Sequence, residues 1–466
     1  MTDATRPGPA SYFNPDSVDR LDAATGDLVR RRQQALGPAY RLFYEHPVQL
    51  VRGSGVHLYD ADGGEYLDVY NNVPSVGHAH PRVTAAIAEQ AALLNTHTRY
   101  LHQGIIDYSE DLLATLPNQL GHVMFTCTGS EANDLALRIA KNHTGNTGII
   151  VTRNAYHGVT TEVAGISPSL GGLSSLAPWV RVIDAPDSYR VDFASVGYQN
   201  LAAWFAAQVT AAIADLAAHG IGLAAFIADS IFASDGVLPG PPEGFLAPTL
   251  EVVQRAGALF IADEVQPGFG RTGGHMWGFE RHGTLATPFV PDIVTIGKPM
   301  GNGMPIAATI LRPEVIEKFG REIRYFNTFG GNPVSIAAAQ ATLDVLRDEH
   351  LQQNAADIGA VLLAGLGELA TRHSCIGDIR GVGLFIAIEL IDPDETVQSK
   401  TGARPNQQLT LSLVNELRRR HVLIGTAGLH NNILKVRPPL PFAAADADRF
   451  LTELDGALSS VPLHSV

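Results

Sequence analysis

Five residues of complementary chemistry each follow a short apolar run of the sequence. Gly129 and Ser130 offer backbone amides to an anion, Tyr156 offers a flat ring, Asp263 a carboxylate and Lys298 an amine. In open α/β sheets, ligands bind beyond the carboxyl ends of the strands. If the apolar runs are strands, these five residues lie at one edge of a sheet and face a common ligand.

Each of these features also has a commoner, purely structural explanation. A Thr or Ser before a helix is usually an ordinary N-cap, although free amides at a helix N-terminus also favour a phosphate group. The pair Asp263-Glu264 suits a metal site, a helix cap or an acid–base residue. Lys298 is not part of a phosphate-binding P-loop, because Pro299 stands where that motif needs Ser or Thr.

Pyridoxal phosphate (PLP) is a ligand that needs all of these groups at once. Its phosphate suits the amides of Gly129 and Ser130, and its ring can stack on Tyr156. A buried carboxylate at Asp263 would keep a proton on the ring nitrogen, so that the ring accepts the electrons of a substrate carbanion. A desolvated amine at Lys298 would form an imine with the aldehyde. We therefore expect PLP as the cofactor, with Lys298 and Asp263 as catalytic residues.

The bulk composition narrows the range of partners. The chain has 466 residues, of which 17% are charged, and its formal net charge is −14. Nucleic acids and anionic membranes are bound by clustered Lys and Arg, so we expect neither as a partner, and small molecules fit better. Because the chain has 2 cysteines and no secretory pattern in its first residues, we expect a cytoplasmic protein. We expect no metal site.

The apolar runs alternate with helical stretches, which predicts an α/β fold with a mostly parallel sheet. The predicted strands are 122–125, 148–151, 224–228, 259–262 and 293–296. The most apolar region, 201–229, is interrupted by polar residues, so it predicts an amphipathic helix followed by a buried strand and not a membrane span.

Three parts of the chain are expected from this pattern. Residues 1–75 predict an N-terminal arm and a β-hairpin that contributes to a small domain, and 76–338 predict the large cofactor-binding domain. Residues 339–466 predict a smaller α+β domain, which begins with one helix up to about residue 372.

Several segments in this order resemble the class III aminotransferases, of the fold type I PLP superfamily, from about residue 40 to residue 454. The segments are Thr128-Gly-Ser-Glu-Ala-Asn133, Tyr156-His-Gly158, Phe260-Ile-Ala-Asp-Glu-Val-Gln266, Gly268-Phe-Gly-Arg-Thr-Gly273, Gly297-Lys298 and Asn327-Thr-Phe-Gly-Gly-Asn-Pro333. The resemblance implies a large domain with a mostly parallel sheet flanked by helices, together with a smaller α+β domain.

The resemblance also assigns roles to residues that match the family's motifs. It implies that Val265 packs on the ring face opposite Tyr156, that Gln266 contacts the ring hydroxyl, and that Lys298 also moves a proton at the substrate carbon. Thr328 would reach the phosphate of a neighbouring subunit's cofactor, which implies a homodimer with shared active sites. On the residues alone, a core valine and a turn threonine are the better explanations of Val265 and Thr328.

The substrate side of the site departs from the commoner family pattern. Where ornithine-type relatives carry a glutamate that pairs with an active-site arginine, this chain has Ser234. Lys435 stands in the place of that arginine, and Arg437 lies two residues on, on the same face of a strand. Either cation could meet a substrate carboxylate or phosphate, and an exposed basic pair is the structural alternative. Tyr44 is expected to line the substrate pocket, by resemblance.

The function expected from the sequence is that of a transaminase, which moves an amino group from an amine, an ω-amino acid or an amino acid to pyruvate or glyoxylate. The segments around Asn72-Val73 and Leu101-His102 look more like the subgroup that holds alanine-glyoxylate aminotransferase 2-like proteins and phospho-lyases acting on phosphoethanolamine. A phospho-lyase is therefore the alternative. A non-catalytic cofactor-binding protein is a third reading, which the complete set of cofactor residues makes improbable.

Overall fold

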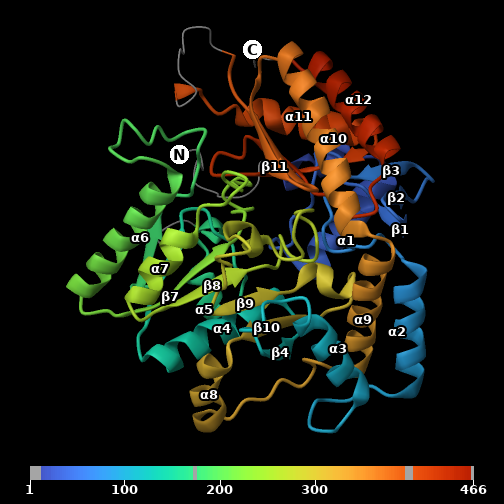
Figure 1. The fold of residues 1–466 in the computed structure, drawn as a ribbon. Coiled ribbons are helices and arrows are strands. Elements are labelled where there is room, and N and C mark those ends of the chain that lie inside the picture. Colours follow the sequence, from blue (N-terminus) through green and yellow to red (C-terminus); the bar gives the residue numbers. More distant parts are fainter. Residues whose placement is uncertain (1–11, 172–175, 394–401, 463–466) are drawn as a thin grey trace.

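The computed structural model describes residues 12–171, 176–393 and 402–462, and a seven-stranded sheet lies at its centre (Figure 1). The strand order is β4-β10-β9-β8-β7-β5-β6. The strands are β4 (His122–Thr126), β5 (Gly148–Thr152), β6 (Val180–Ile183), β7 (Leu223–Asp229), β8 (Leu259–Asp263), β9 (Ile293–Ile296) and β10 (Ala307–Leu311). Strands β5 to β9 pair in parallel, whereas β10 is antiparallel to β4 and β9.

The sheet is covered by helices, which explains why its strands are apolar along their whole length and not in alternation. Every residue of β5, β8, β9 and β10 is buried. The helices of this part are α2 (Pro81–Leu93), α3 (Gln103–Leu113), α4 (Gly129–Thr144), α5 (Thr161–Ala164), α6 (Leu201–Ala218), α7 (Ala247–Arg255), α8 (Pro313–Glu322) and α9 (Pro333–Asp348). The short 3₁₀ helices are η1 (Pro15–Arg20), η2 (Pro168–Leu170), η4 (Gly278–His282) and η5 (Lys298–Gly301).

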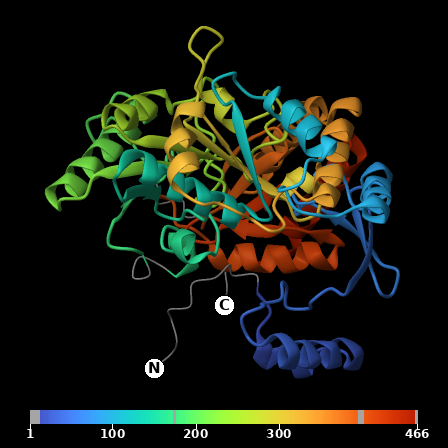
Figure 2. The same ribbon diagram turned by 90° about the horizontal axis from the view of Figure 1, so that it is seen from below.

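Two four-stranded sheets are built from the two ends of the chain. One has the order β1-β2-β3-β13 and the other β11-β12-β15-β14. Their elements are α1 (Ala23–Leu36), β1 (Leu50–Ser54), β2 (His57–Asp60), β3 (Glu65–Asp68), α10 (Leu351–Arg372), β11 (Ile376–Val382), β12 (Phe385–Leu390), α11 (Gln407–Arg419), β13 (Val422–Leu423), β14 (Gly425–Ala427), β15 (Ile433–Val436) and α12 (Ala444–Ser460). Because β13 pairs in parallel with β3, the N-terminal strands join the C-terminal part. Helix α1 stands away from the body (Figure 2).

The expected α/β architecture is confirmed, with differences in detail. All five predicted strands are present, but the edge strand β6 and the antiparallel β10 were not expected. The single helix expected up to about residue 372 is two helices, α9 and α10. The break lies at His350, whose φ of 53° is left-handed and cannot continue a right-handed helix.

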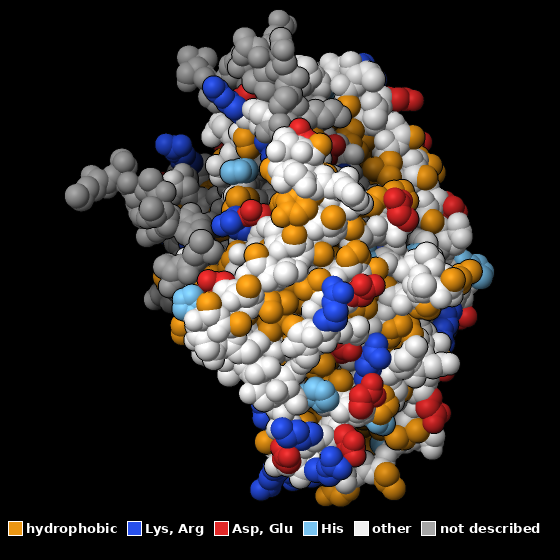
Figure 3. Space-filling view, turned by 60° about the vertical axis from the view of Figure 1, so that its left-hand side comes forward, with side chains coloured by type: hydrophobic (Ala, Val, Ile, Leu, Met, Phe, Trp, Pro, Cys, Tyr) orange, Lys and Arg blue, Asp and Glu red, His pale blue; other side chains and the backbone are white. Residues whose placement is uncertain are grey.

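Helix α6 is long and apolar enough to cross a membrane by length and composition alone. In this fold it packs on α7 and on the sheet, with Trp204, Phe205 and Val209 in the core. A core helix of a soluble protein passes the same test, so α6 is weak evidence for a membrane span. On the face drawn in Figure 3, Lys and Arg side chains lie interspersed with Asp and Glu.

A buried ion-pair cluster ties the C-terminal sheet to the segment before α6. Glu389 on β12 is 2% exposed and accepts hydrogen bonds from Arg190 Nε (2.9 Å) and Arg380 Nη1 (2.8 Å). Arg380 also donates to the carbonyl of Gly236, which follows β7 (3.0 Å). Because β12 pairs with β15, this cluster helps to hold β15 against the large sheet.

Candidate active site

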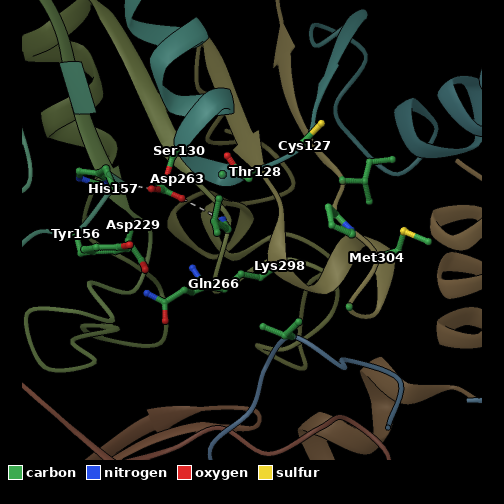
Figure 4. Close-up of a pocket in the computed structure, with 17 residues that line it drawn as sticks. Cys127, Thr128, Ser130, Tyr156, His157, Asp229, Asp263, Gln266, Lys298 and Met304 are labelled. Carbon is green, nitrogen blue, oxygen red and sulfur yellow. Dashed lines mark hydrogen bonds and ion pairs between the residues drawn. The ribbon is translucent and has the colours of Figure 1, made fainter. Parts of the chain in front are cut away.

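The carboxyl ends of β4, β8 and β9 bring the predicted cofactor residues together around a cavity of about 310 Å³. Asp263, Gln266, Lys298 and Asp229 converge on this space in Figure 4. The predicted residues that line it are Gly129, Ser130, Tyr156, Asp263, Val265, Gln266 and Lys298. A cavity of this size falls at the lower end of the range for small-molecule sites.

The N-terminus of α4 forms an anion cradle. Thr128 is the N-cap, and its Oγ1 accepts from the Glu131 amide (3.2 Å) while Glu131 Oε2 accepts from the Thr128 amide (3.2 Å). This capping box leaves the amides of Gly129 and Ser130 directed at the cavity, where the helix dipole favours a phosphate. The helix therefore has both an N-cap and a free anion site, which the sequence had left as alternatives.

Close packing around the cradle requires glycine at Gly158. A Cβ at Gly158 would stand 2.4 Å from Ser130 Oγ, and the φ of Gly158 is +138°. In return, Ser130 Oγ accepts a hydrogen bond from the Val159 amide (3.1 Å). The loop after Tyr156 thus presses against the start of α4 and shapes the cradle.

Asp263 is held in one orientation by three donors. His157 Nδ1 (2.7 Å) and Asn133 Nδ2 (3.0 Å) both meet its Oδ2, and the Val265 amide donates to its Oδ1 (3.1 Å). Thr295 Oγ1 donates to Asn133 Oδ1 (2.6 Å), which fixes the direction of that amide. A buried carboxylate oriented in this way suits a contact with a protonated ring nitrogen.

Lys298 follows β9 and has a φ of 20°, outside the ordinary right-handed region. Burial lowers the pKa of Lys298, Arg437 lowers it further, and Asp263 and Asp229 oppose the shift. A lowered pKa favours the neutral amine that attacks an aldehyde. Asp229 lies beside Asp263 in the register of β7 and β8, and burial together with the charge of Asp263 raises its pKa to about 7.

A second cavity of about 1020 Å³ shares Tyr156, Gln266 and Lys298 with the first and extends to β15. Lys435 and Arg437, which line it, are only 6% and 8% exposed, so the alternative of an exposed basic pair is wrong. Gln266 Oε1 accepts from Arg437 Nη1 (2.7 Å) and from Lys435 Nζ (3.4 Å).

Arg437 is braced by two further neutral groups. Its Nη1 donates to Asn72 Oδ1 (3.1 Å), and its guanidinium carbon lies 4.7 Å from the centre of the Tyr70 ring. Among the described residues, no carboxylate forms a salt bridge with Lys435 or Arg437. Two buried cations therefore face the cavity with only neutral hydrogen-bond partners.

Two predicted site residues lie outside both cavities. Tyr44 is 7% exposed, and its hydroxyl donates to the Ile424 carbonyl (3.2 Å), so this side chain belongs to the core. Thr328 is exposed, between Phe326 and Phe329 with 39% and 68% exposure. The expectation that Thr328 serves a neighbouring subunit stays a prediction.

Sequence reasoning missed the residues that support the site. His157 and Asn133 stood inside quoted motifs but received no role, because their contacts with Asp263 join distant segments of the chain. Tyr70 and Tyr12 also line the larger cavity without having been singled out. For His157, the one available signal was its place directly after Tyr156 at the end of a strand-and-loop unit.

The family model for class III aminotransferases matches residues 43–458 of this chain. The chain belongs to the class III aminotransferases. It is 38% identical to an alanine-glyoxylate aminotransferase 2-like protein of Drosophila melanogaster, over 93% of this chain and 87% of the relative. It is 37% identical to ethanolamine-phosphate phospho-lyase homolog 1 of Caenorhabditis elegans, over 93% of both chains.

Solved structures of class III aminotransferase relatives share the fold. A phospholyase from Arthrobacter in complex with phosphoethanolamine is 44% identical, with a TM-score of 0.87 over 94% of this chain and 100% of that chain. A transaminase from the marine bacterium Virgibacillus is 25% identical, with a TM-score of 0.78 over 92% and 94%. These relatives confirm a fold type I enzyme of this class that depends on PLP.

The residues of this site fit PLP. The cradle at Gly129 and Ser130 suits its phosphate, the oriented Asp263 suits its ring nitrogen, and the amine of Lys298 lies in the same cavity. A Cβ at Gly129 would approach Val265 Cγ2 to 3.1 Å, so the cradle and the residue expected on one ring face are packed closely together. Among the described residues, no group of three or more His, Cys, Asp or Glu is placed to hold a metal ion.

Proposed function

We propose that this class III enzyme is a phospho-lyase, which eliminates phosphate from a small amino-alkyl phosphate ester such as phosphoethanolamine. The observation that carries the proposal is the pair Lys435 and Arg437, buried in the cavity that also holds Lys298 and unpaired with a carboxylate among the described residues. This reverses the preference drawn from the sequence, where transamination came first.

Charge matching favours a phosphate ester over a carboxylate at this pair. A phosphate monoester carries nearly two negative charges at neutral pH, and a carboxylate carries one. Burying two cations without an anion is costly, and a bound dianion offsets that cost. Asp229 and Asp235 lie close enough to favour the charge on Lys435, but neither forms an ion pair with it.

The residues divide the work of an elimination among them. PLP, when bound, supplies a ring that accepts the electron pair of the carbon that loses its proton. Asp263, oriented by His157 and Asn133, holds the proton on the ring nitrogen. Lys298, whose pKa burial lowers, takes the proton from the carbon that bears the amine. The Lys435–Arg437 pair binds the phosphate at the far end of the substrate.

The comparisons support the proposal in two ways. The Arthrobacter phospholyase, in complex with phosphoethanolamine, is 44% identical over 94% of this chain. The C. elegans relative, named as an ethanolamine-phosphate phospho-lyase homolog, covers 93%. Transamination is the second candidate, because the Drosophila relative is named as an aminotransferase-like protein and both reactions use the same cofactor residues.

A parallel assay of the cofactor-loaded protein distinguishes the two reactions. We expect phosphoethanolamine to yield phosphate, ammonia and acetaldehyde in equal amounts without any keto acid, because an elimination followed by hydrolysis needs only water. A panel of amines with pyruvate or glyoxylate should yield little product. Consumption of the keto acid without phosphate release would overturn the proposal and favour the transaminase.

We also propose a homodimer with shared active sites. Thr328 lies on an exposed segment with Phe326 and Phe329, and an exposed pair of large apolar rings is typical of an interface. Light scattering should give twice the mass of one chain, and Thr328→Ala should weaken cofactor binding. A monomer that binds the cofactor fully would contradict this.

A further inference from the structure

The two cations of the larger cavity are held in different ways. Arg437 has two hydrogen bonds shorter than 3.2 Å and lies against the ring of Tyr70, so its guanidinium is fixed. Lys435 has one recorded hydrogen bond, a long one of 3.4 Å to Gln266 Oε1, and its Nζ stands 5.4 Å from the centre of the Phe385 ring. Most of the donor capacity of the Lys435 ammonium is therefore free for a ligand.

Elimination of phosphate makes a demand that charge alone does not meet. When the C–O bond of a dianionic ester breaks, the bond's electron pair stays on the phosphate oxygen, and the product is a strongly basic trianion unless a proton arrives. Arginine cannot supply that proton, because its guanidinium stays protonated in proteins. Lysine can, particularly when burial has shifted its pKa.

We propose that Lys435 is the general acid of the elimination and that Arg437 is the fixed anchor of the phosphate. This rests on the proposed phospho-lyase function. Lys298 takes the proton from the carbon bearing the amine, and that C–H electron pair forms the new carbon–carbon double bond. The C–O electron pair moves to the bridging oxygen, which takes a proton from Lys435. Phosphate leaves as the hydrogen phosphate dianion, and the neutral Lys435 regains a proton from solvent in the cavity.

The surroundings of Lys435 suit an acid that is charged only with help. Burial lowers the pKa of Lys435 well below its ordinary value, and Arg437 and Lys298 lower it further, while Asp229 and Asp235 oppose them. The incoming phosphate dianion raises that pKa again and so favours the ammonium when the substrate is bound. A weakly held proton next to a developing base is the arrangement that general acid catalysis needs.

A comparison of two leaving groups tests the role of Lys435. Lys435→Arg keeps the positive charge but cannot release a proton. We expect this variant to lower kcat for phosphoethanolamine by about 10² to 10⁴, the usual contribution of general acid catalysis. Elimination of sulfate from ethanolamine O-sulfate should fall by less than about tenfold, because sulfate is a weak base and needs no proton.

Arg437→Lys is the matched comparison, since it keeps the charge and loses the braced guanidinium fork. It should raise KM for both esters by similar factors and leave the ratio of their kcat values unchanged. Calorimetric titration with inorganic phosphate provides a readout besides activity. Lys435→Arg should bind phosphate within about threefold of the wild type, because the charge is retained, and its cofactor absorbance should be unchanged.

An equal fall for both esters, or an undiminished kcat with phosphoethanolamine in Lys435→Arg, would overturn the role of Lys435. If the wild type does not eliminate sulfate, the pH profile decides: the loss of kcat at alkaline pH must be present in the wild type and absent from Lys435→Arg. If the wild type releases no phosphate at all, the phospho-lyase function itself fails, which is a separate result.

Discussion

Replacing Lys435 by methionine is expected to stabilise the substrate-free protein. Its ammonium is buried, has one 3.4 Å hydrogen bond and forms no recorded salt bridge within the described residues. An effective penalty of several kcal/mol for a buried ion, reduced by one weak charged hydrogen bond and the attraction of Asp229 and Asp235, leaves about 1–3 kcal/mol. Methionine has a similar length and would pack on Phe385, 5.4 Å from Nζ.

The pH dependence of this gain follows from the direction of the pKa shift. Burial makes the pKa of Lys435 lower in the folded than in the unfolded chain. Below the folded pKa the ammonium is present in both states and its penalty is fully felt. Above the unfolded pKa, near about 10.4, the amine is neutral in both states and the penalty disappears. The gain from Lys435→Met should therefore be largest near neutral pH and shrink towards pH 10.

Urea unfolding of the cofactor-loaded protein, with and without inorganic phosphate, measures both effects. Phosphate at 100 times its dissociation constant should stabilise the wild type by about 2.7 kcal/mol and Lys435→Met by far less. Lys318→Met is the control, because Lys318 lies on α8 and donates to the Asn142 carbonyl outside the cavity (2.8 Å). If Lys435→Met unfolds at lower urea, or gains as much from phosphate as the wild type, the reasoning is refuted.

Two further substitutions test the cofactor cradle and the ion-pair cluster. Gly158→Ala should weaken cofactor binding by about 10- to 100-fold in an absorbance titration, because its Cβ would stand 2.4 Å from Ser130 Oγ, whereas Gly367→Ala, with open space around it, should leave binding unchanged. Although burial opposes ionisation, Arg380 with its neighbouring arginine keeps the pKa of Glu389 below its ordinary value, so Glu389 adds stability at neutral pH that is lost as the pH falls through that value. Glu389→Gln should cost about 3 kcal/mol at pH 7 in urea unfolding, and its deficit should shrink at acidic pH; a constant deficit would speak against an ionic role.

The sequence predicted the cofactor side of the site better than the substrate side. Gly129, Asp263 and Lys298 follow strands whose apolar runs are complete in the sequence, and parallel strands bring their carboxyl ends to one edge. Local pattern was therefore enough to place them in one cavity. Strand β10 was missed because an antiparallel insertion between β4 and β9 leaves no mark on local apolar content.

The substrate side depends on contacts between distant parts of the chain. The burial of Arg437 comes from Tyr70 and Asn72 at the end of the N-terminal sheet, more than three hundred residues earlier. Nothing local distinguishes such an arginine from an exposed one. Tyr44 shows the opposite error: an aromatic residue near the pocket in sequence has its hydroxyl on the Ile424 carbonyl and lies in the core.

The most direct test of the account is product analysis of the cofactor-loaded protein with phosphoethanolamine in the absence of any keto acid. We predict phosphate and ammonia in a ratio of one to one over many turnovers, because elimination regenerates the starting form of the enzyme at every cycle. Phosphate release that is lost in Arg437→Met would link the reaction to the buried cation pair. No phosphate release, with amine consumption that stops after a single turnover until pyruvate or glyoxylate is added, would contradict the account and identify a transaminase.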